Sequence, residues 1–144
     1  GFEVFLQAEL TNNLQLFGSY NYTFGRILTD SIPYPLDHIA PAFGKLSLRY
    51  AMLHNKLKLE GFMLYSGWKR LEDYNFVGED NFAYATADGM PSWYTMNLRA
   101  NYNINNQLSV QVACENILDR NYRMFASNIS APGRNFILTL RGNF

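Results

Sequence analysis

Apolar and polar side chains alternate along most of this chain, with the two-residue period that is typical of a β-strand. In the last run, for example, Leu138 and Leu140 share one side, while Thr139 and Arg141 share the other. Seven runs alternate in this way, and we expect a strand from each: 2–10, 14–24, 43–50, 56–68, 93–102, 108–115 and 135–144. No stretch has the spacing of an amphipathic helix, so the pattern predicts an all-β fold.

The two sides of these runs differ sharply in charge. The apolar sides carry no charged side chain, whereas the second sides carry nine: Glu3, Glu9, Lys45, Arg49, Lys58, Glu60, Arg99, Glu115 and Arg141. This separation predicts a sheet with one apolar and one polar face. Alternation alone leaves both orientations open, because the apolar face is the core of a soluble barrel but contacts lipid in an outer-membrane barrel.

The lengths of the runs and of the connections between them favour lipid. Most runs are about as long as a strand that crosses a bilayer at a tilt, and tyrosines gather toward their ends. The connections alternate strictly between short (11–13, 51–55, 103–107) and long (25–42, 69–92, 116–134). All short turns therefore lie on one side, as periplasmic turns do in outer-membrane barrels, and the C-terminus lies on that side too. The pattern predicts an antiparallel, up-and-down transmembrane β-barrel segment of about seven strands, open in isolation.

Composition agrees with a surface that meets both water and lipid, because aromatic residues make up 16% of the 144-residue chain and charged residues only 17%. The net charge is zero, so nothing indicates nucleic-acid binding.

A C-terminal set of motifs resembles a known family. Asn116, Asp119 and Tyr122 lie in the segment 116–122, and a Pro-Gly-Arg sequence and an alternating terminal strand follow: Pro132, Gly133 and Arg134, then 135–144. This order is similar to the C-terminus of TonB-dependent outer-membrane receptors, as is the Pro-containing segment 35–41 before a barrel strand.

The resemblance implies a bacterial outer-membrane location and a role in the import of iron chelates such as siderophores, of cobalamin or of glycans. It also implies that the barrel-assembly machinery reads the last strand through Leu138, Leu140 and Phe144. Residues 1–144 are then expected to be the C-terminal portion of a barrel domain, without the plug domain and the earlier strands. Outer-membrane lipid and that plug are expected partners, and TonB would be contacted only through the parent chain.

The candidate ligand contacts are aromatic residues of the longest connection and one aromatic residue on the lumen side of the preceding run: Tyr74, Phe76, Phe82 and Tyr84, and Trp68. Loops on a rigid scaffold often carry function, although these rings could equally pack on one another. Apolar side chains also interrupt the polar face, namely Phe5, Phe17, Phe62, Leu64 and Trp68. They fit either a substrate-contacting patch or packing against a plug, and we favour the plug.

Nothing in the sequence indicates an enzyme, a cofactor or a metal site. Cys114 is the single cysteine, and no nucleophile elbow or phosphate-binding loop is present. The acidic residues Glu72, Asp73, Glu79 and Asp80 do not have EF-hand spacing, so a hydrated loop is the better interpretation. Two alternatives remain: a small self-contained outer-membrane barrel that acts as adhesin, pore or lipid-acting enzyme, and a soluble ligand-binding β-barrel.

The lipid orientation makes a mutational prediction on the run 93–102. We expect Leu98→Arg to impair membrane assembly and Asn97→Arg, on the opposite face, to be mild.

Overall fold

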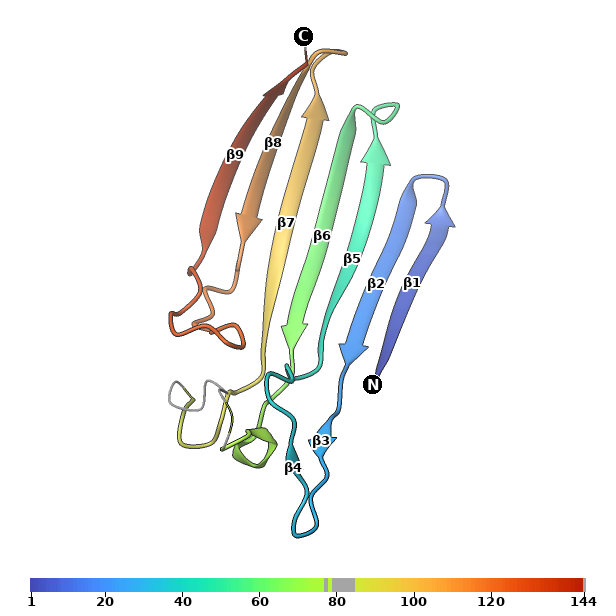
Figure 1. The fold of residues 1–144 in the computed structure, drawn as a ribbon. Helices are drawn as coiled ribbons and strands as arrows, with labels where there is room; N and C mark the ends of the chain where they lie inside the picture. The colour runs from blue at the N-terminus through green and yellow to red at the C-terminus, as the bar shows by residue number, and fades with distance from the viewer. Residues whose placement is uncertain (77, 79–84, 144) are drawn as a thin grey trace.

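The computed structural model describes residues 1–76, 78 and 85–143, and it is built around one antiparallel sheet of seven strands (Figure 1). In spatial order the strands are β1 (Phe2–Thr11), β2 (Leu14–Tyr22), β5 (Phe43–Met52), β6 (Leu57–Ser66), β7 (Trp93–Asn103), β8 (Leu108–Glu115) and β9 (Asn135–Gly142). Each strand pairs only with its sequence neighbours in this sheet, and β1 and β9 form its two edges. The predicted all-β, up-and-down and open architecture is confirmed.

Short elements in the long connections were not predicted. β3 (Arg26–Ile27) and β4 (Tyr34–Pro35) pair with each other, and a 3-10 helix, η1, spans Leu71–Asp73. Elements of two or three residues are too short to show a period in the sequence. No helix in the described part of the chain is long and apolar enough to cross a membrane.

The two ends of the sheet differ as the connection lengths predict. The three short turns lie at one end together with the chain's C-terminal end, and the long connections lie at the other (Figure 1). The β5–β6 turn is tight, because Leu53, His54 and Asn55 all have positive φ angles, between 53° and 65°. We call these the short-turn end and the long-loop end.

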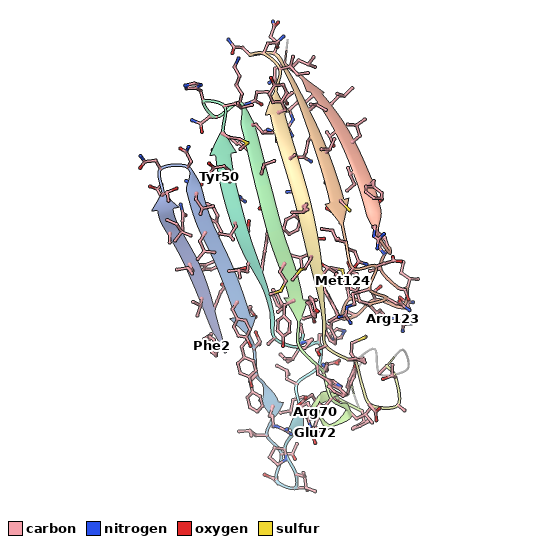
Figure 2. All side chains as sticks on the ribbon, turned by 180° about the vertical axis from the view of Figure 1, so that it is seen from behind. Phe2, Tyr50, Arg70, Glu72, Arg123 and Met124 are labelled. Carbon is pink, nitrogen blue, oxygen red and sulfur yellow. The ribbon has the colours of Figure 1, made fainter. Side chains whose placement is uncertain are left out.

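Aromatic side chains lie near both ends of the strands. Figure 2 shows Tyr50 toward the short-turn end of β5 and Phe2 at the long-loop end of β1. The Phe2 ring lies 6.1 Å from the Tyr20 ring and 5.7 Å from the Tyr22 ring, centroid to centroid. Such rings suit the interface between hydrocarbon and water.

The apolar face of the sheet is the exposed one. Leu98 is 57% exposed and Leu140 is 69% exposed, whereas Thr95 and Asn97 on the opposite face are 1% and 4% exposed. A soluble protein buries its apolar face, so this sheet is inverted relative to a soluble barrel. Polar side chains from neighbouring strands crowd the other face, which we call the polar wall.

The burial of Asn97 corrects one expectation. Its Nδ2 donates to the Phe62 carbonyl at 3.2 Å and to Thr95 Oγ1 at 3.2 Å, and its Oδ1 accepts from the Asn116 N–H at 2.9 Å. Arginine at this packed position would break all three bonds, so Asn97→Arg is not expected to be mild. Asn101 on the same strand and face is half-buried, and we use it as the polar-face position below.

Candidate functional site

A carboxylate surrounded by cations lies at the centre of the polar wall. The strand register puts Arg49, Glu60 and Arg99 side by side on β5, β6 and β7. Glu60 accepts from Ser47 Oγ at 2.7 Å and from Arg49 Nε at 3.1 Å, and it pairs with Arg99 Nη1 at 3.3 Å and Lys45 Nζ at 3.5 Å. One carboxylate is therefore shared by three cationic side chains.

Two aromatic rings lie beneath these cations. Lys45 Nζ lies 4.6 Å from the centre of the Phe62 ring, and the Arg99 guanidinium lies 5.1 Å from the same ring. The Arg49 guanidinium lies 4.3 Å from the centre of the Phe17 ring. Both rings thus hold the cations in place through cation–π contacts.

The other apolar residues predicted on this face are less covered. Phe5 is exposed on β1, and Leu64 is half-buried on β6. Whether they contact substrate or a plug stays a prediction.

A hollow of about 480 Å³ opens on the short-turn half of the polar wall. Residues of the short turns form its rim, among them Asn12, Asn13 and Asn55. Its charged lining consists of Arg49, Lys58, Glu60, Arg99 and Arg141.

Of the predicted aromatic ligand contacts, the structure describes Trp68, Tyr74 and Phe76, which differ in exposure. Trp68 is about half exposed, and its indole N–H donates to the Asp88 carbonyl at 2.9 Å. Phe76 is exposed. Phe82 and Tyr84 lie outside the described residues, as do Glu79 and Asp80.

Tyr74 departs from the expected exposed position, because it is fully buried (0% exposed). Its ring packs against the ammonium group of Lys69, at 4.7 Å from the ring centre, and Phe125 approaches the same group at 4.5 Å. Lys69, itself only 2% exposed, donates to the Ile39 carbonyl at 2.7 Å. The buried lysine thus joins all three long connections, and Tyr74 is part of this packing rather than of an outward ligand surface.

The residues of the family motif come together between β8 and β9, and Asn116 is their centre. Its Nδ2 donates to the Arg120 carbonyl at 2.8 Å and the Pro132 carbonyl at 3.2 Å, and its Oδ1 accepts from the Arg120 N–H at 2.9 Å. Asn116 also has a positive φ of 49°, which asparagine tolerates better than most residues. A single side chain therefore ties the two ends of the connection together.

The remaining motif residues extend this contact. Asp119 Oδ1 accepts from the Arg134 N–H at 2.8 Å, and Arg134 Nε donates to the Ile117 carbonyl at 2.9 Å. A Cβ at Gly133 would lie 2.7 Å from Asp119 Oδ1, so a larger residue here would displace the Asp119 carboxylate. We call these residues the motif cluster: Asn116, Asp119, Tyr122, Pro132, Gly133 and Arg134. Their hydrogen bonds hold the two ends of the connection between β8 and β9 together.

Tyr122 packs against Trp93, the first residue of β7. Its ring lies 4.3 Å from the Trp93 ring, centroid to centroid, and its carbonyl accepts from the Ala131 N–H at 2.9 Å. Burial raises the pKa of the Tyr122 phenol, and the negative charge of Glu115 raises it further.

The residues expected to serve as an assembly signal are placed only in part. Leu138 and Leu140 are exposed on the apolar face of the edge strand β9. Phe144 lies outside the described residues. Their role in assembly stays a prediction.

Sequence reasoning missed the roles of three polar residues: the half-buried Glu60 as a shared partner, the buried Asn97 as the contact between β7 and the motif cluster, and the buried Lys69 in the loops. The sequence placed Glu60 among nine charges of one face but could not say which strands would bring those charges together. For Lys69 the sequence holds no signal that we can identify.

Comparisons with known proteins agree with this geometry. Residues 1–117 match the family described as TonB dependent receptor-like, beta-barrel, and this span includes six of the seven strands of the sheet. Among solved structures, the copper transporter OprC matches with a TM-score of 0.78 over 99% of this chain, at 19% sequence identity. The chain spans 22% of the length of that transporter. A search of curated proteins found no match. Because the family match covers most of the chain, this protein belongs to the TonB-dependent receptor-like β-barrel family.

Proposed function

We propose that this chain forms part of the wall of an outer-membrane importer that is powered through TonB. The apolar face contacts lipid, and the polar wall lines the lumen through which the solute passes. The short-turn end faces the periplasm, and the long loops face the outside of the cell. The chain contributes no catalytic chemistry in this proposal.

The observation that carries the proposal is the inversion of the two faces. Leucines along the sheet face outward, while a hydrogen-bonded and ion-paired network fills the opposite face. In water the exposed leucines would cost about 25 cal/mol for each Å² of apolar surface, whereas in a bilayer the same surface is matched to hydrocarbon. Members of the family are outer-membrane proteins, which supports the same orientation.

The resemblance favours an iron chelate, cobalamin or a glycan as the substrate. The relative is named a copper transporter, but a likeness at 19% identity concerns the fold and does not carry copper over to this chain. Outer-membrane lipid, the barrel-assembly machinery and TonB are the proposed partners.

A pair of arginine substitutions on β7 tests the orientation. Leu98→Arg places a charge on the exposed apolar face, where it should cost roughly 2 to 4 kcal/mol near the bilayer midplane. Asn101→Arg places the same charge on the polar wall, where water in the lumen can solvate it. The measurement is the amount of intact protein in the outer-membrane fraction and its heat-modifiable mobility on a gel.

We expect Leu98→Arg to lower the assembled fraction and Asn101→Arg to leave it close to wild type. The opposite order would show that the apolar face is buried in protein and would reject the lumen assignment.

TonB dependence is tested by uptake of a labelled ferric chelate, cobalamin and an oligosaccharide in cells with and without TonB. If uptake requires this protein but is unaffected by loss of TonB, the proposal that import is powered through TonB is rejected.

A further inference from the structure

Four cationic side chains surround the hollow on the short-turn half of the polar wall. Arg49, Lys58, Arg99 and Arg141 line it together with a single carboxylate, Glu60. They come from β5, β6, β7 and β9, so the sheet itself gathers them from four strands. A concave surface lined mainly by one sign of charge concentrates the electric field and attracts counter-ions.

The charges of the hollow are only partly neutralised. Glu60 is shared between Arg49, at 3.1 Å, Arg99, at 3.3 Å, and Lys45, at 3.5 Å, and Arg99 also lies 3.8 Å from Glu115. Lys58 and Arg141 form no ion pair with any residue that the structure describes. Positive charge therefore remains in excess inside the hollow.

Neutral hydrogen-bonding groups complete the lining. Six amide side chains border the hollow: Asn12, Asn13, Gln15, Asn55, Asn101 and Gln111. Amide N–H groups donate to anionic oxygens, and arginine guanidinium groups match carboxylate and phosphate with two parallel hydrogen bonds. The volume, about 480 Å³, falls in the range of small-molecule sites.

We propose that this hollow binds a small multivalent anion that carries carboxylate or phosphate groups. The proposal rests on the proposed function, because only a lumen-lining face would meet a solute in transit. A free solute fits better than an acidic polypeptide, since the cations converge on one bounded hollow instead of following the length of the strands. The hollow would hold the anion near the periplasmic mouth.

Glu60 has a second role in this site. Its carboxylate holds Arg49 and Arg99 at fixed positions, and it also competes with any anion for the same guanidinium groups. Glu60→Gln keeps an oxygen that can accept from Ser47 but removes the negative charge. The substitution should therefore strengthen anion binding.

Calorimetric titration of the intact, detergent-purified protein with tripolyphosphate tests the site at low ionic strength. We expect the double variant Arg49→Gln/Arg141→Gln to bind about tenfold more weakly or worse, because charge-assisted hydrogen bonds are lost. Glu60→Gln should bind more tightly, and binding should weaken with added salt. Arg70→Gln is the matched control, because Arg70 lies in the long-loop region, far from the hollow (Figure 2). It should bind like wild type.

Each outcome decides the proposal. Equal affinity in wild type and the double variant, or an equal loss in Arg70→Gln, would overturn it. Binding of a glutamate-rich peptide without binding of tripolyphosphate would also overturn it, in favour of an acidic polypeptide. If the double variant fails to assemble, Lys58→Gln replaces it, since this exposed side chain has no ion pair among the described residues and its loss should still weaken binding several-fold.

The two proposals fail separately. Reversed sensitivities of Leu98→Arg and Asn101→Arg would reject the lumen assignment whatever the titration gives. If that pair behaves as expected and tripolyphosphate does not bind, only the anion site is rejected.

Discussion

Replacing Asn116 by alanine should open the connection between β8 and β9. The Asn116 side chain is 3% exposed and makes three hydrogen bonds, two to the backbone of Arg120 and one to the Pro132 carbonyl. Each such bond contributes a net of about 0.5 to 1.5 kcal/mol, so the three together contribute roughly 2 to 4 kcal/mol. Alanine also tolerates the positive φ less well than asparagine, which adds about 1 kcal/mol.

Hydrogen–deuterium exchange of the intact protein measures this loss locally. Peptides from 116–134 should exchange at least about a hundredfold faster in Asn116→Ala, since each 1.4 kcal/mol of lost local stability is roughly a factor of ten. The Arg120 amide should respond most, because it loses its acceptor, Asn116 Oδ1. The Ala131 and Arg134 amides should follow, because they donate to Tyr122 and Asp119 within the motif cluster. Strands β5 and β6 should be unaffected.

Two further variants separate the causes. Asn116→Gly loses the same side-chain bonds but accepts the positive φ, so it should be about 1 kcal/mol less harmful than alanine. Asn128→Ala removes an exposed asparagine from the same connection and should change little. If Asn116→Ala and Asn128→Ala exchange alike, the hydrogen bonds of Asn116 do not hold the connection closed, and the reasoning is refuted.

Three other predictions concern the loops and the terminus. Lys69→Met removes the buried ammonium group that binds the Ile39 carbonyl and contacts two aromatic rings. Limited proteolysis should therefore cut within 25–42 faster in this variant than in the control Lys56→Met, which replaces an exposed lysine. Equal cleavage rates in the two variants would contradict the role of Lys69. The pKa of the Tyr122 phenol is raised in the folded state. This tyrosine therefore contributes stability that is fully present below its unfolded pKa and is lost as the pH rises through its folded pKa. Near-ultraviolet titration should show one tyrosine that ionises at a higher pH than the others, and this signal should disappear in Tyr122→Phe. Deleting Phe144 should lower outer-membrane insertion far more than synthesis, measured by fractionation against total protein, whereas normal insertion would reject a role in assembly.

The strands could be predicted because the alternation of apolar and polar residues that identifies each strand lies within that strand's own sequence. The bounds of β8, Leu108–Glu115, agree with the prediction to the residue. β6 was predicted to reach Trp68 but ends at Ser66. The Gly67 N–H still bonds to the Ala42 carbonyl opposite it in the β5–β6 register, and the indole of Trp68 then bonds to the Asp88 carbonyl in the following connection. Alternation continues past the end of the strand and gives no sign of it.

The polar contacts could not be predicted in the same way. The pairing of Glu60 with Arg49 and Arg99 depends on the register of three strands, and a shift by one residue would have put Glu60 on the other face. Tyr74 looked like its aromatic neighbours in the sequence. It is buried against Lys69, which also contacts Ile39 and Phe125 from the other two long connections, and the sequence gives no sign of these distant contacts. The motif cluster lies between these cases, since the order of its residues indicated a family but not its hydrogen bonds.

The odd number of strands in the sheet restricts how its two edges can be joined. Seven antiparallel strands in sequence mean that β1 and β9 run in the same direction, toward the short-turn end. A direct seam between them would therefore be parallel, and a second copy that paired antiparallel with β9 would have to lie upside down in the membrane, with its long loops among the short turns. Antiparallel closure in one membrane orientation thus takes an odd number of additional strands, whichever segment supplies them.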